Sequence, residues 1–124
     1  MTQEEERLLL KDLCGRLPYD VRFSYPSFSN VPQLLMSIGN YATIEINEYI
    51  EDPPKLEDIK PYLRPMSSMT TEEAEQFEFI SEELLGSREE IWEAVIDWLN
   101  EHHFDYRGLI EKGLALEAPE GMYK

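Results

Sequence analysis

The sequence predicts one α+β domain, in which a small antiparallel sheet of about three strands packs with an N-terminal helix and two to three C-terminal helices. Three observations lead to this class: apolar residues recur at helical spacing near both ends, they alternate with polar residues over residues 19–25, and proline-rich segments separate these regions. With 124 residues, of which 42% are hydrophobic, the chain is long enough for one core and too short for two independent ones. We therefore expect a single domain over residues 1–124.

The first helix is expected over residues 3–14. Thr2 and Glu5 have the spacing of a capping box, in which each side chain accepts a hydrogen bond from the main chain of the other residue. Apolar residues then follow at intervals of three and four: Leu9, Leu10, Leu13, Cys14 and Leu17. Gly15 is expected to end the helix, and Pro18 prevents its continuation because the proline ring clashes with the preceding turn.

A strand is expected next, because Val21, Phe23 and Tyr25 alternate with polar residues as in a half-buried strand. Pro26 ends it, and residues 27–32, rich in Ser, Asn and Pro, are expected to form a loop.

A hairpin is expected between residues 33–38 and 42–47, because Gly39-Asn40 separates two apolar stretches and glycine allows the positive φ of a tight turn. The first arm consists of good helix formers and could instead be a short helix. Together with the preceding strand, the hairpin would complete a sheet with one apolar face.

Residues 59–70 are expected to form a proline-rich extended segment after the helix and strand region of residues 1–58. Pro61 and Pro65 push the residues before them toward extended geometry and cannot donate to a β-ladder. The segment is therefore either an edge strand or a strap laid across the domain. Its expected anchors are Ile59, Tyr62 and Leu63.

Residues 71–116 are expected to be helical. Thr70 with Glu73 has capping-box spacing and begins a helix to about residue 85, and Ser87 with Glu90 begins another to about residue 101. The apolar stripes of these helices are Phe77, Ile80 and Leu84, and Ile91, Trp92, Val95, Trp98 and Leu99.

A short fourth helix is expected over residues 106–112, with Asp105 as its cap and Gly113 at its C′ position. Residues 117–124 are expected to form a loose tail.

The chain is strongly acidic, with a formal net charge of −15. Residues 1–66 hold 11 acids and 7 bases, net −4, and residues 67–124 hold 15 acids and 4 bases, net −11. Such a field repels phosphate backbones and anionic lipids, so we expect no direct nucleic-acid binding and no membrane binding. It permits a basic protein partner, or it simply keeps the protein in solution.

The expected compartment is the cytoplasm. The one cysteine, Cys14, cannot form an intrachain disulfide, and no basic segment followed by an apolar run opens the chain. No stretch approaches the roughly 18–20 consecutive apolar residues of a membrane helix. Cys14 itself is expected to be buried rather than nucleophilic, because a helix C-terminus disfavours a thiolate.

We expect no catalytic, cofactor-binding or metal-binding residues, and hence no enzyme. His102 and His103 have metal-ligand side chains, but adjacent helical residues point about 100° apart, and histidines at a helix end more commonly bond free carbonyls. Acid pairs such as Glu72-Glu73 complement the positive end of a helix. The sequence contains no Walker-type glycine loop, nucleophile elbow or zinc-protease motif.

Three runs are distinctive in wording: IKPYLRPMSSMT at residues 59–70, WLNEHHFDYRGLI at residues 98–110 and APEGMY at residues 118–123. Together they resemble a family of small uncharacterised proteins of gut anaerobic bacteria that look like cargo of prophages or other mobile elements. The resemblance implies a bacterial cytoplasmic accessory protein and assigns no catalytic residue.

These observations predict a non-catalytic protein that acts through protein contacts, although no motif names an activity. The candidates for partner contact are Tyr62, Arg64, Tyr106 and Arg107. Two alternatives stay open: an acidic DNA mimic that inhibits a basic DNA-handling protein, and a small-ligand-binding domain with a pocket lined by Trp92 or Trp98.

Overall fold

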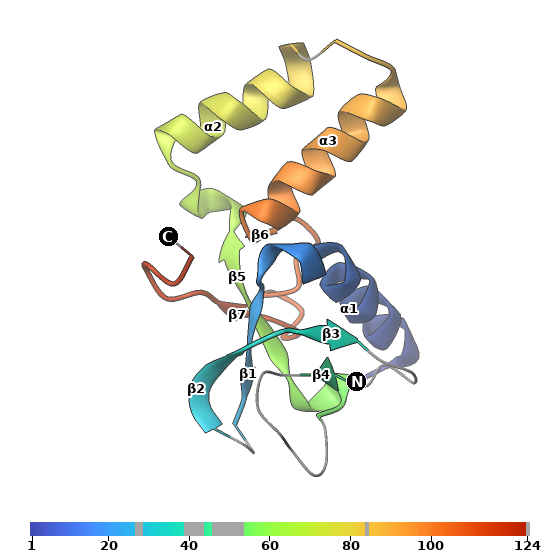
Figure 1. The fold of residues 1–124 in the computed structure, drawn as a ribbon, viewed down its shortest axis with the longest axis vertical. Helices are drawn as coiled ribbons and strands as arrows, with labels where there is room; N and C mark the ends of the chain where they lie inside the picture. The colour runs from blue at the N-terminus through green and yellow to red at the C-terminus, as the bar shows by residue number, and fades with distance from the viewer. Residues whose placement is uncertain (27–28, 39–43, 46–53, 84, 124) are drawn as a thin grey trace.

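The structure of the chain is a computed structural model that describes residues 1–26, 29–38, 44–45, 54–83 and 85–123. It confirms the α+β class, with an N-terminal helix and further helices after the strands (Figure 1). The main sheet differs from the prediction, because it has five strands instead of about three and is mixed instead of antiparallel.

The N-terminal helix α1 (Gln3–Arg16) begins at the predicted capping box. The Thr2 hydroxyl accepts a hydrogen bond from the Glu5 amide at 3.1 Å, and the Glu5 carboxylate accepts one from the Thr2 amide at 2.9 Å. The helix passes into the 3-10 turn η1 (Leu17–Tyr19), which has Pro18 in its first turn.

Gly15 does not end α1, contrary to the prediction. Its role is in packing against α3 (Arg88–Glu101), because a Cβ atom at Gly15 would come within 3.0 Å of Asn100 Nδ2. The missing side chain therefore allows the two helices to approach each other closely.

The five strands of the main sheet are β1 (Arg22–Tyr25), β2 (Ser29–Leu34), β5 (Lys60–Pro65), β6 (Phe104–Asp105) and β7 (Leu116–Glu117). Their order is β2-β1-β5-β6, with β7 also paired to β5. β1 is antiparallel to β2 and β5, whereas β6 and β7 run parallel to β5. The predicted strand is thus confirmed as β1, while β2 begins inside the segment predicted to be a loop.

β5 has the predicted extended geometry, but it lies between β1 and β6 and not at an edge of the sheet. The neighbours of β5 pair with different parts of it: β1 with Lys60 and Pro61, β7 with Tyr62 and Leu63, and β6 with Arg64 and Pro65. The Arg64 amide donates to the His103 carbonyl at 2.7 Å. The Leu63 carbonyl accepts from the Ala118 amide at 2.8 Å. Both bonds use groups that proline does not remove, so two prolines are tolerated in an interior strand.

Within the predicted hairpin, β3 (Ser37–Ile38) is antiparallel to β4 (Ile44–Glu45). These two strands make a separate sheet, so the expectation that the hairpin would complete one sheet with the preceding strand is wrong. The first arm of the hairpin is extended and not helical. The Gly39-Asn40 turn lies outside the described residues. The 3-10 turn η3 (Leu56–Asp58) then leads into β5.

The first C-terminal helix begins at its predicted capping box, with reciprocal bonds between Thr70 and Glu73. It follows the 3-10 turn η4 (Met66–Ser68) and consists of α2 (Thr71–Glu78) with a π-helical continuation, η5 (Phe79–Glu83).

The second C-terminal helix, α3, begins after Ser87, whose hydroxyl accepts a hydrogen bond from the Glu90 amide at 3.2 Å. α2 and α3 form a hairpin that extends beyond one end of the main sheet (Figure 1). The predicted pair of helices is thus confirmed.

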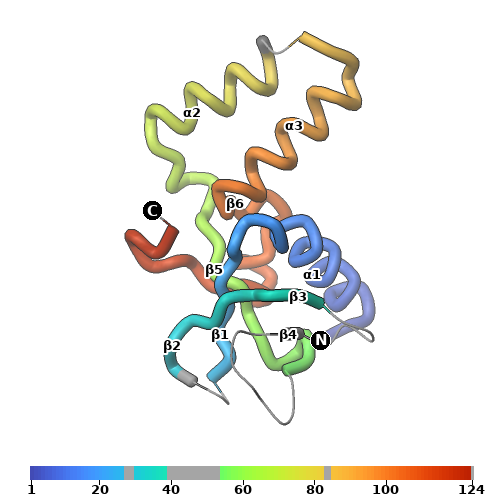
Figure 2. The backbone as a smooth tube through the Cα atoms, viewed as in Figure 1, coloured from blue at the N-terminus to red at the C-terminus, as the bar shows by residue number. Residues whose placement is uncertain are grey.

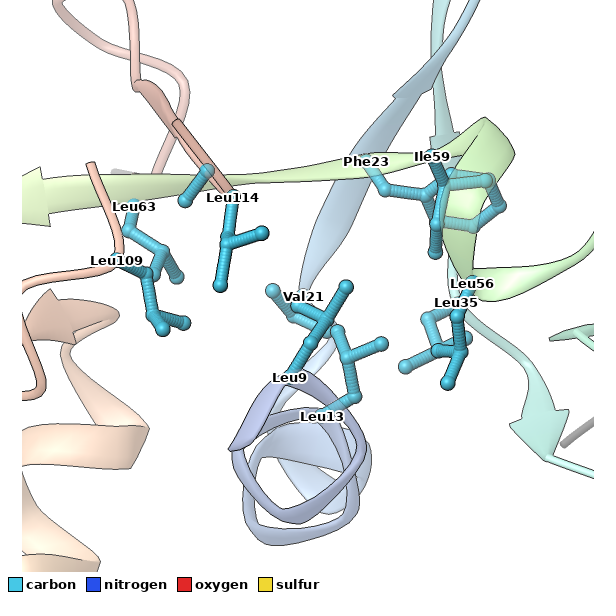
Figure 3. Packing of buried hydrophobic residues seen from close by; sticks show 11 residues of the cluster. Leu9, Leu13, Val21, Phe23, Leu35, Leu56, Ile59, Leu63, Leu109 and Leu114 are labelled. Carbon is cyan, nitrogen blue, oxygen red and sulfur yellow. The ribbon is translucent and has the colours of Figure 1, made fainter. Parts of the chain in front are cut away.

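Two buried clusters hold these elements together. The larger joins α1 to the main sheet, and Figure 3 shows Leu9 and Leu13 of α1 pointing toward Val21. Its other members are Phe23, Leu35, Leu56, Ile59, Leu63, Leu109, Leu114 and Ala115. The smaller cluster lies at the base of the hairpin and consists of Val95, Trp98, Leu99 and Phe104.

The predicted fourth helix is not formed, because residues 106–112 make a series of turns. Asp105 is a cap as predicted, but its two carboxylate oxygens accept from the amides of Leu109 and Ile110 at 2.9 and 3.0 Å and so close a turn. Gly113 has a φ of 74°, as expected for a C′ residue.

The end of the described chain is docked, in contrast to the loose tail expected for residues 117–124. β7 pairs with β5, and the Tyr123 hydroxyl donates to the Tyr62 carbonyl at 2.8 Å. Figure 2 shows this segment turning back beside β5.

Candidate functional site

The hairpin of α2, η5 and α3, residues 71–101, carries most of the negative charge of the chain; we call it the acidic hairpin. It contains 11 acidic residues and one basic residue, so its net charge is −10 out of −15 for the whole chain. Because it extends beyond the sheet, this charge is concentrated at one end of the molecule (Figure 1). Such a concentration attracts positively charged partners and accelerates their association.

Three large apolar side chains of the acidic hairpin are exposed: Phe79 by 53%, Leu85 by 95% and Trp92 by 66%. Trp92 was expected in the apolar face of its helix, and that prediction is wrong. It lies about 100° around the helix from half-buried Ile91, outside the stripe that packs against α2. A large exposed side chain such as that of Trp92 is a candidate anchor for a protein contact.

Shallow depressions adjoin two of these side chains. One, of about 570 Å³, is bordered by Trp92, Ile91 and Arg88. Another, of about 490 Å³, is bordered by Phe79, Ile80 and Trp98. Trp98 itself is only 8% exposed and packs against Phe77 and Phe104, so it serves the core more than a ligand pocket.

A clamp between Arg64 and Glu73 fixes the base of the acidic hairpin to the sheet. The Arg64 guanidinium donates two hydrogen bonds to the Glu73 carboxylate, at 2.7 and 2.8 Å, and lies over the Phe104 ring at 4.2 Å from its centroid. These bonds lower the pKa of Glu73 to about 2, against the opposing effect of burial. β5, α2 and β6 are therefore joined through one side chain.

A buried ion pair contacts the main chain of Phe104. Asp12 and Arg16, one turn apart on α1, are fully buried and form a bidentate pair at 2.7 and 3.1 Å. Arg16 Nη2 also donates to the Phe104 carbonyl at 2.6 Å. Arg16 Nη1 is buried and has no hydrogen-bond partner within the described part of the chain. The pair thus ties α1 to β6 in a region from which water is excluded.

A chain of hydrogen bonds connects this pair to α3. Arg107 Nε donates to Asp12 at 3.1 Å, and Arg107 Nη2 donates to the Tyr106 hydroxyl at 3.1 Å. That hydroxyl in turn donates to Asn100 Oδ1 on α3 at 2.9 Å. The Arg16 guanidinium lies 5.3 Å from the centroid of the Tyr106 ring. We call these five residues, Asp12, Arg16, Asn100, Tyr106 and Arg107, the polar junction.

His103 follows the end of α3 with a left-handed backbone, φ 63°, which is unusual for a residue other than glycine. Its ring is stacked on Tyr123 with centroids 3.7 Å apart. His103 Nδ1 is buried without a hydrogen-bond partner among the described residues. Burial, together with the positive charge of Arg16, lowers the pKa of His103 to about 4, so the imidazole is neutral at pH 7.

A cleft of about 370 Å³ lies beside His103 and Tyr123. Its walls include Tyr19, Asp20, Arg22, Arg64, His103 and Tyr123. Asp20 has a φ of 55°, so both described non-glycine residues with positive φ border this cleft. Burial raises the pKa of Tyr123 to about 12 and also raises the pKa of Tyr19. Strained backbone and shifted pKa values in one cleft are features common at functional sites.

The residues predicted to contact a partner are separated by the structure. Arg64 belongs to the clamp, whereas Tyr106 and Arg107 belong to the polar junction. The Tyr62 carbonyl accepts a hydrogen bond from the Tyr123 hydroxyl. Each has a contact within the chain, which gives it a structural role and leaves its contact with a partner as a prediction.

The other candidate residues have ordinary explanations. Cys14 is exposed, so the prediction of a buried thiol is wrong; it lies about 140° around α1 from Leu9, away from the sheet. His102 Nδ1 lies 2.8 Å from the Trp98 carbonyl, as expected for a histidine at a helix end. Within the described residues, no three His, Cys, Asp or Glu side chains are grouped so that they could hold a metal ion.

Sequence reasoning missed Asp12, Arg16 and Tyr123. Asp12 and Arg16 were not singled out, yet they share the stripe of Leu9 and Leu13 on α1 and have the spacing of a helical ion pair. That spacing was the available signal. Tyr123 offered none, because its partners are main-chain groups from distant strands.

Comparison of the chain with protein-family models, with curated proteins and with solved structures found no match. Across the described ranges, no helix combines the length and the apolar character that crossing a bilayer requires. Conclusions on function therefore depend on the geometry alone.

The shifted pKa values predict two successive losses of stability on acidification. The pKa of His103 falls from 6.5 in the unfolded chain to about 4 in the folded one, so the unfolded state takes up a proton first and stability falls between these values. The pKa of Glu73 falls from 4.5 to about 2, so its contribution is lost below pH 4.5. Asparagine tolerates positive φ, so a His103→Asn variant should keep the local backbone. In this variant the urea midpoint of unfolding should depend less on pH between pH 6.5 and 4.5.

The substitution should reduce the slope of the free energy of unfolding against pH by at most about 1.4 kcal/mol per pH unit, the value for one proton. A Glu73→Gln control should leave the upper window unchanged and alter only the lower one. An unchanged slope in His103→Asn would contradict the prediction.

Proposed function

We propose that this chain is a non-catalytic, bacterial cytoplasmic accessory protein that acts through contacts made by the acidic hairpin. One observation supports this most directly: Trp92, Leu85 and Phe79 are exposed on a segment with 11 acids and one base. The partner that fits presents an apolar patch bordered by lysine or arginine residues.

Energetics favour such a partner over a purely charged one. Covering a large apolar side chain is worth about 1.5–3 kcal/mol, and exposed tryptophan side chains are frequent anchors of interfaces. The surrounding carboxylates would steer the basic partner and fix its orientation. Trp92 is the expected centre of the contact, because it is the largest of the three exposed side chains.

The prediction is tested with a labelled synthetic peptide that forms an amphipathic helix with leucine on one face and lysine on the other. Combined Trp92→Ala and Leu85→Ala substitutions should weaken binding about tenfold or more at constant salt. Glu89→Gln with Glu93→Gln, which removes two exposed acids from the same helix, should reduce the salt dependence. Fluorescence anisotropy measures both effects.

The matched control is Met36→Ala, which truncates a side chain that is 46% exposed but lies outside the acidic hairpin. It should bind the peptide like wild type. A scrambled peptide of the same composition should bind weakly, because it offers no apolar face. Equal binding of the scrambled peptide, or no effect of the double substitution, would overturn the proposal.

A second candidate, a DNA mimic, is supported by the net charge of −10 on residues 71–101. In that case the acidic hairpin would compete with duplex DNA for a basic DNA-handling protein, and binding would fall steeply with added salt. The two proposals differ at Trp92: its truncation would leave a charge mimic unaffected but would weaken the mixed contact proposed above.

A further inference from the structure

The depression beside Phe79 differs in charge from the depression beside Trp92. Two exposed acids, Glu72 and Glu75, border the depression beside Phe79, and none of the described residues that line it is basic. The depression beside Trp92 is bordered by one base and one acid. Charge therefore favours a cation beside Phe79 and makes no such choice beside Trp92.

The spacing of these residues on α2 places the acids and the ring on one face of the helix. Glu72, Glu75 and Phe79 are separated by three and four residues, so their side chains follow one another along the helix surface. The Phe79 side chain is 53% exposed. Neither carboxylate has a hydrogen bond or an ion pair with another described residue. An aromatic ring and two carboxylates thus lie next to each other and are open to a partner.

The molecule contains an example of what such groups bind. The Arg64 guanidinium lies over the Phe104 ring, 4.2 Å from its centroid, and donates two hydrogen bonds to the Glu73 carboxylate. A planar guanidinium satisfies an aromatic face and a carboxylate together, whereas a lysine ammonium is a compact point charge on a flexible stem. Beside Phe79, the chain supplies the ring and the carboxylates, and a partner would supply the guanidinium.

We propose that the depression beside Phe79 binds an arginine side chain of the partner protein, with the guanidinium over the Phe79 ring and paired with Glu72 or Glu75. The aliphatic stem of this arginine covers Ile80, which borders the same depression. The arginine site rests on the proposed function, because it is one part of the contact between the acidic hairpin and a basic partner. It specifies which basic residue that partner presents and where that residue binds.

The test compares two labelled peptides: the amphipathic leucine–lysine helix, and the same peptide with every lysine replaced by arginine. Wild type should bind the arginine peptide about fivefold more tightly, because the guanidinium combines ring stacking with a bidentate ion pair. Phe79→Leu keeps an apolar side chain but removes the flat ring, and it should reduce this preference to less than about twofold. Glu72→Gln with Glu75→Gln should have the same effect, because it removes the ion pair. Fluorescence anisotropy measures each affinity.

The matched control is Glu89→Gln with Glu93→Gln, which removes the same charge from the acidic hairpin but outside the depression beside Phe79. It should weaken binding of both peptides alike and keep the preference for arginine. Equal binding of the two peptides to wild type would overturn the arginine site. The proposed function would still stand in that case if Trp92→Ala with Leu85→Ala weakened both peptides. If none of these substitutions changed binding of either peptide, both proposals would be overturned.

The position of the arginine is tested separately from the preference for it. All substituted side chains at this site are exposed, so the variants should fold like wild type, which circular dichroism checks. A preference for arginine that survived both Phe79→Leu and the double substitution at Glu72 and Glu75 would overturn this site. A dimer that Phe79→Leu dissociates would assign the depression to a second copy of this chain and overturn the choice of a separate partner protein.

Discussion

Asp12→Ala is expected to lower the free energy of unfolding by about 3–5 kcal/mol, because it leaves the Arg16 guanidinium as an uncompensated charge in the interior. Both side chains are fully buried, and Arg107 loses its bond to the same carboxylate. The remaining acceptor for Arg16 is the Phe104 carbonyl, which carries no full charge. Urea unfolding followed by circular dichroism measures the loss.

The matched control is Lys11→Ala, which alters an exposed charge beside Asp12 on the same helix. It should change stability by no more than about 0.5 kcal/mol. Asp12→Leu combined with Arg16→Met should recover much of the loss, because apolar replacement of both partners removes the buried charges together. A loss under about 1 kcal/mol in Asp12→Ala would mean that water or another group reaches Arg16.

Local sequence signals predicted some parts of the fold and not others. Capping boxes at Thr2 and Thr70 and the alternation around Phe23 are local signals, and the structure confirms the elements that they predict. The roles of Gly15 and Asn100 depend on how closely two helices approach, which no local pattern encodes. Local reasoning therefore found these elements and missed the contacts that join them.

The sheet was under-predicted for a related reason. β6 and β7 are only two residues long, and each pairs with β5 across a large separation in sequence. Strands this short show no alternation to detect. The prolines of β5 indicated an edge strand or an extended strap, but short neighbours that each pair with a different part of β5 make an interior position compatible with prolines.

The negative charge of the candidate surface was predictable from the sequence, but the exposure of its apolar side chains was not. The sequence places the negative charge in its second half, whereas Trp92 is exposed because Ile91, its neighbour on the helix, is the residue that packs against the smaller buried cluster. A tryptophan within an apolar stripe is normally assigned to a core. In the structure Trp92 is exposed, and this exposure is the basis of the proposed contact.

Phe104→Ala is expected to lower the free energy of unfolding by about 3–5 kcal/mol, the usual cost of truncating a fully buried aromatic residue. The Phe104 ring is completely buried, lies 5.7 Å from the Trp98 ring between centroids, and supports the Arg64 guanidinium. Its loss would therefore weaken both the smaller buried cluster and the clamp to Glu73. Urea unfolding gives the total, and hydrogen exchange in α2 and α3 locates it.

Leu85→Ala is the control, because it truncates an apolar side chain of the acidic hairpin that is 95% exposed. It should leave stability within about 0.5 kcal/mol of wild type, although it should weaken binding of the basic peptide. If Phe104→Ala cost no more than Leu85→Ala, Phe104 could not be the residue that secures the hairpin. A large loss confined to α2 and α3, with the α1 amides still protected, would show that the two buried clusters unfold separately.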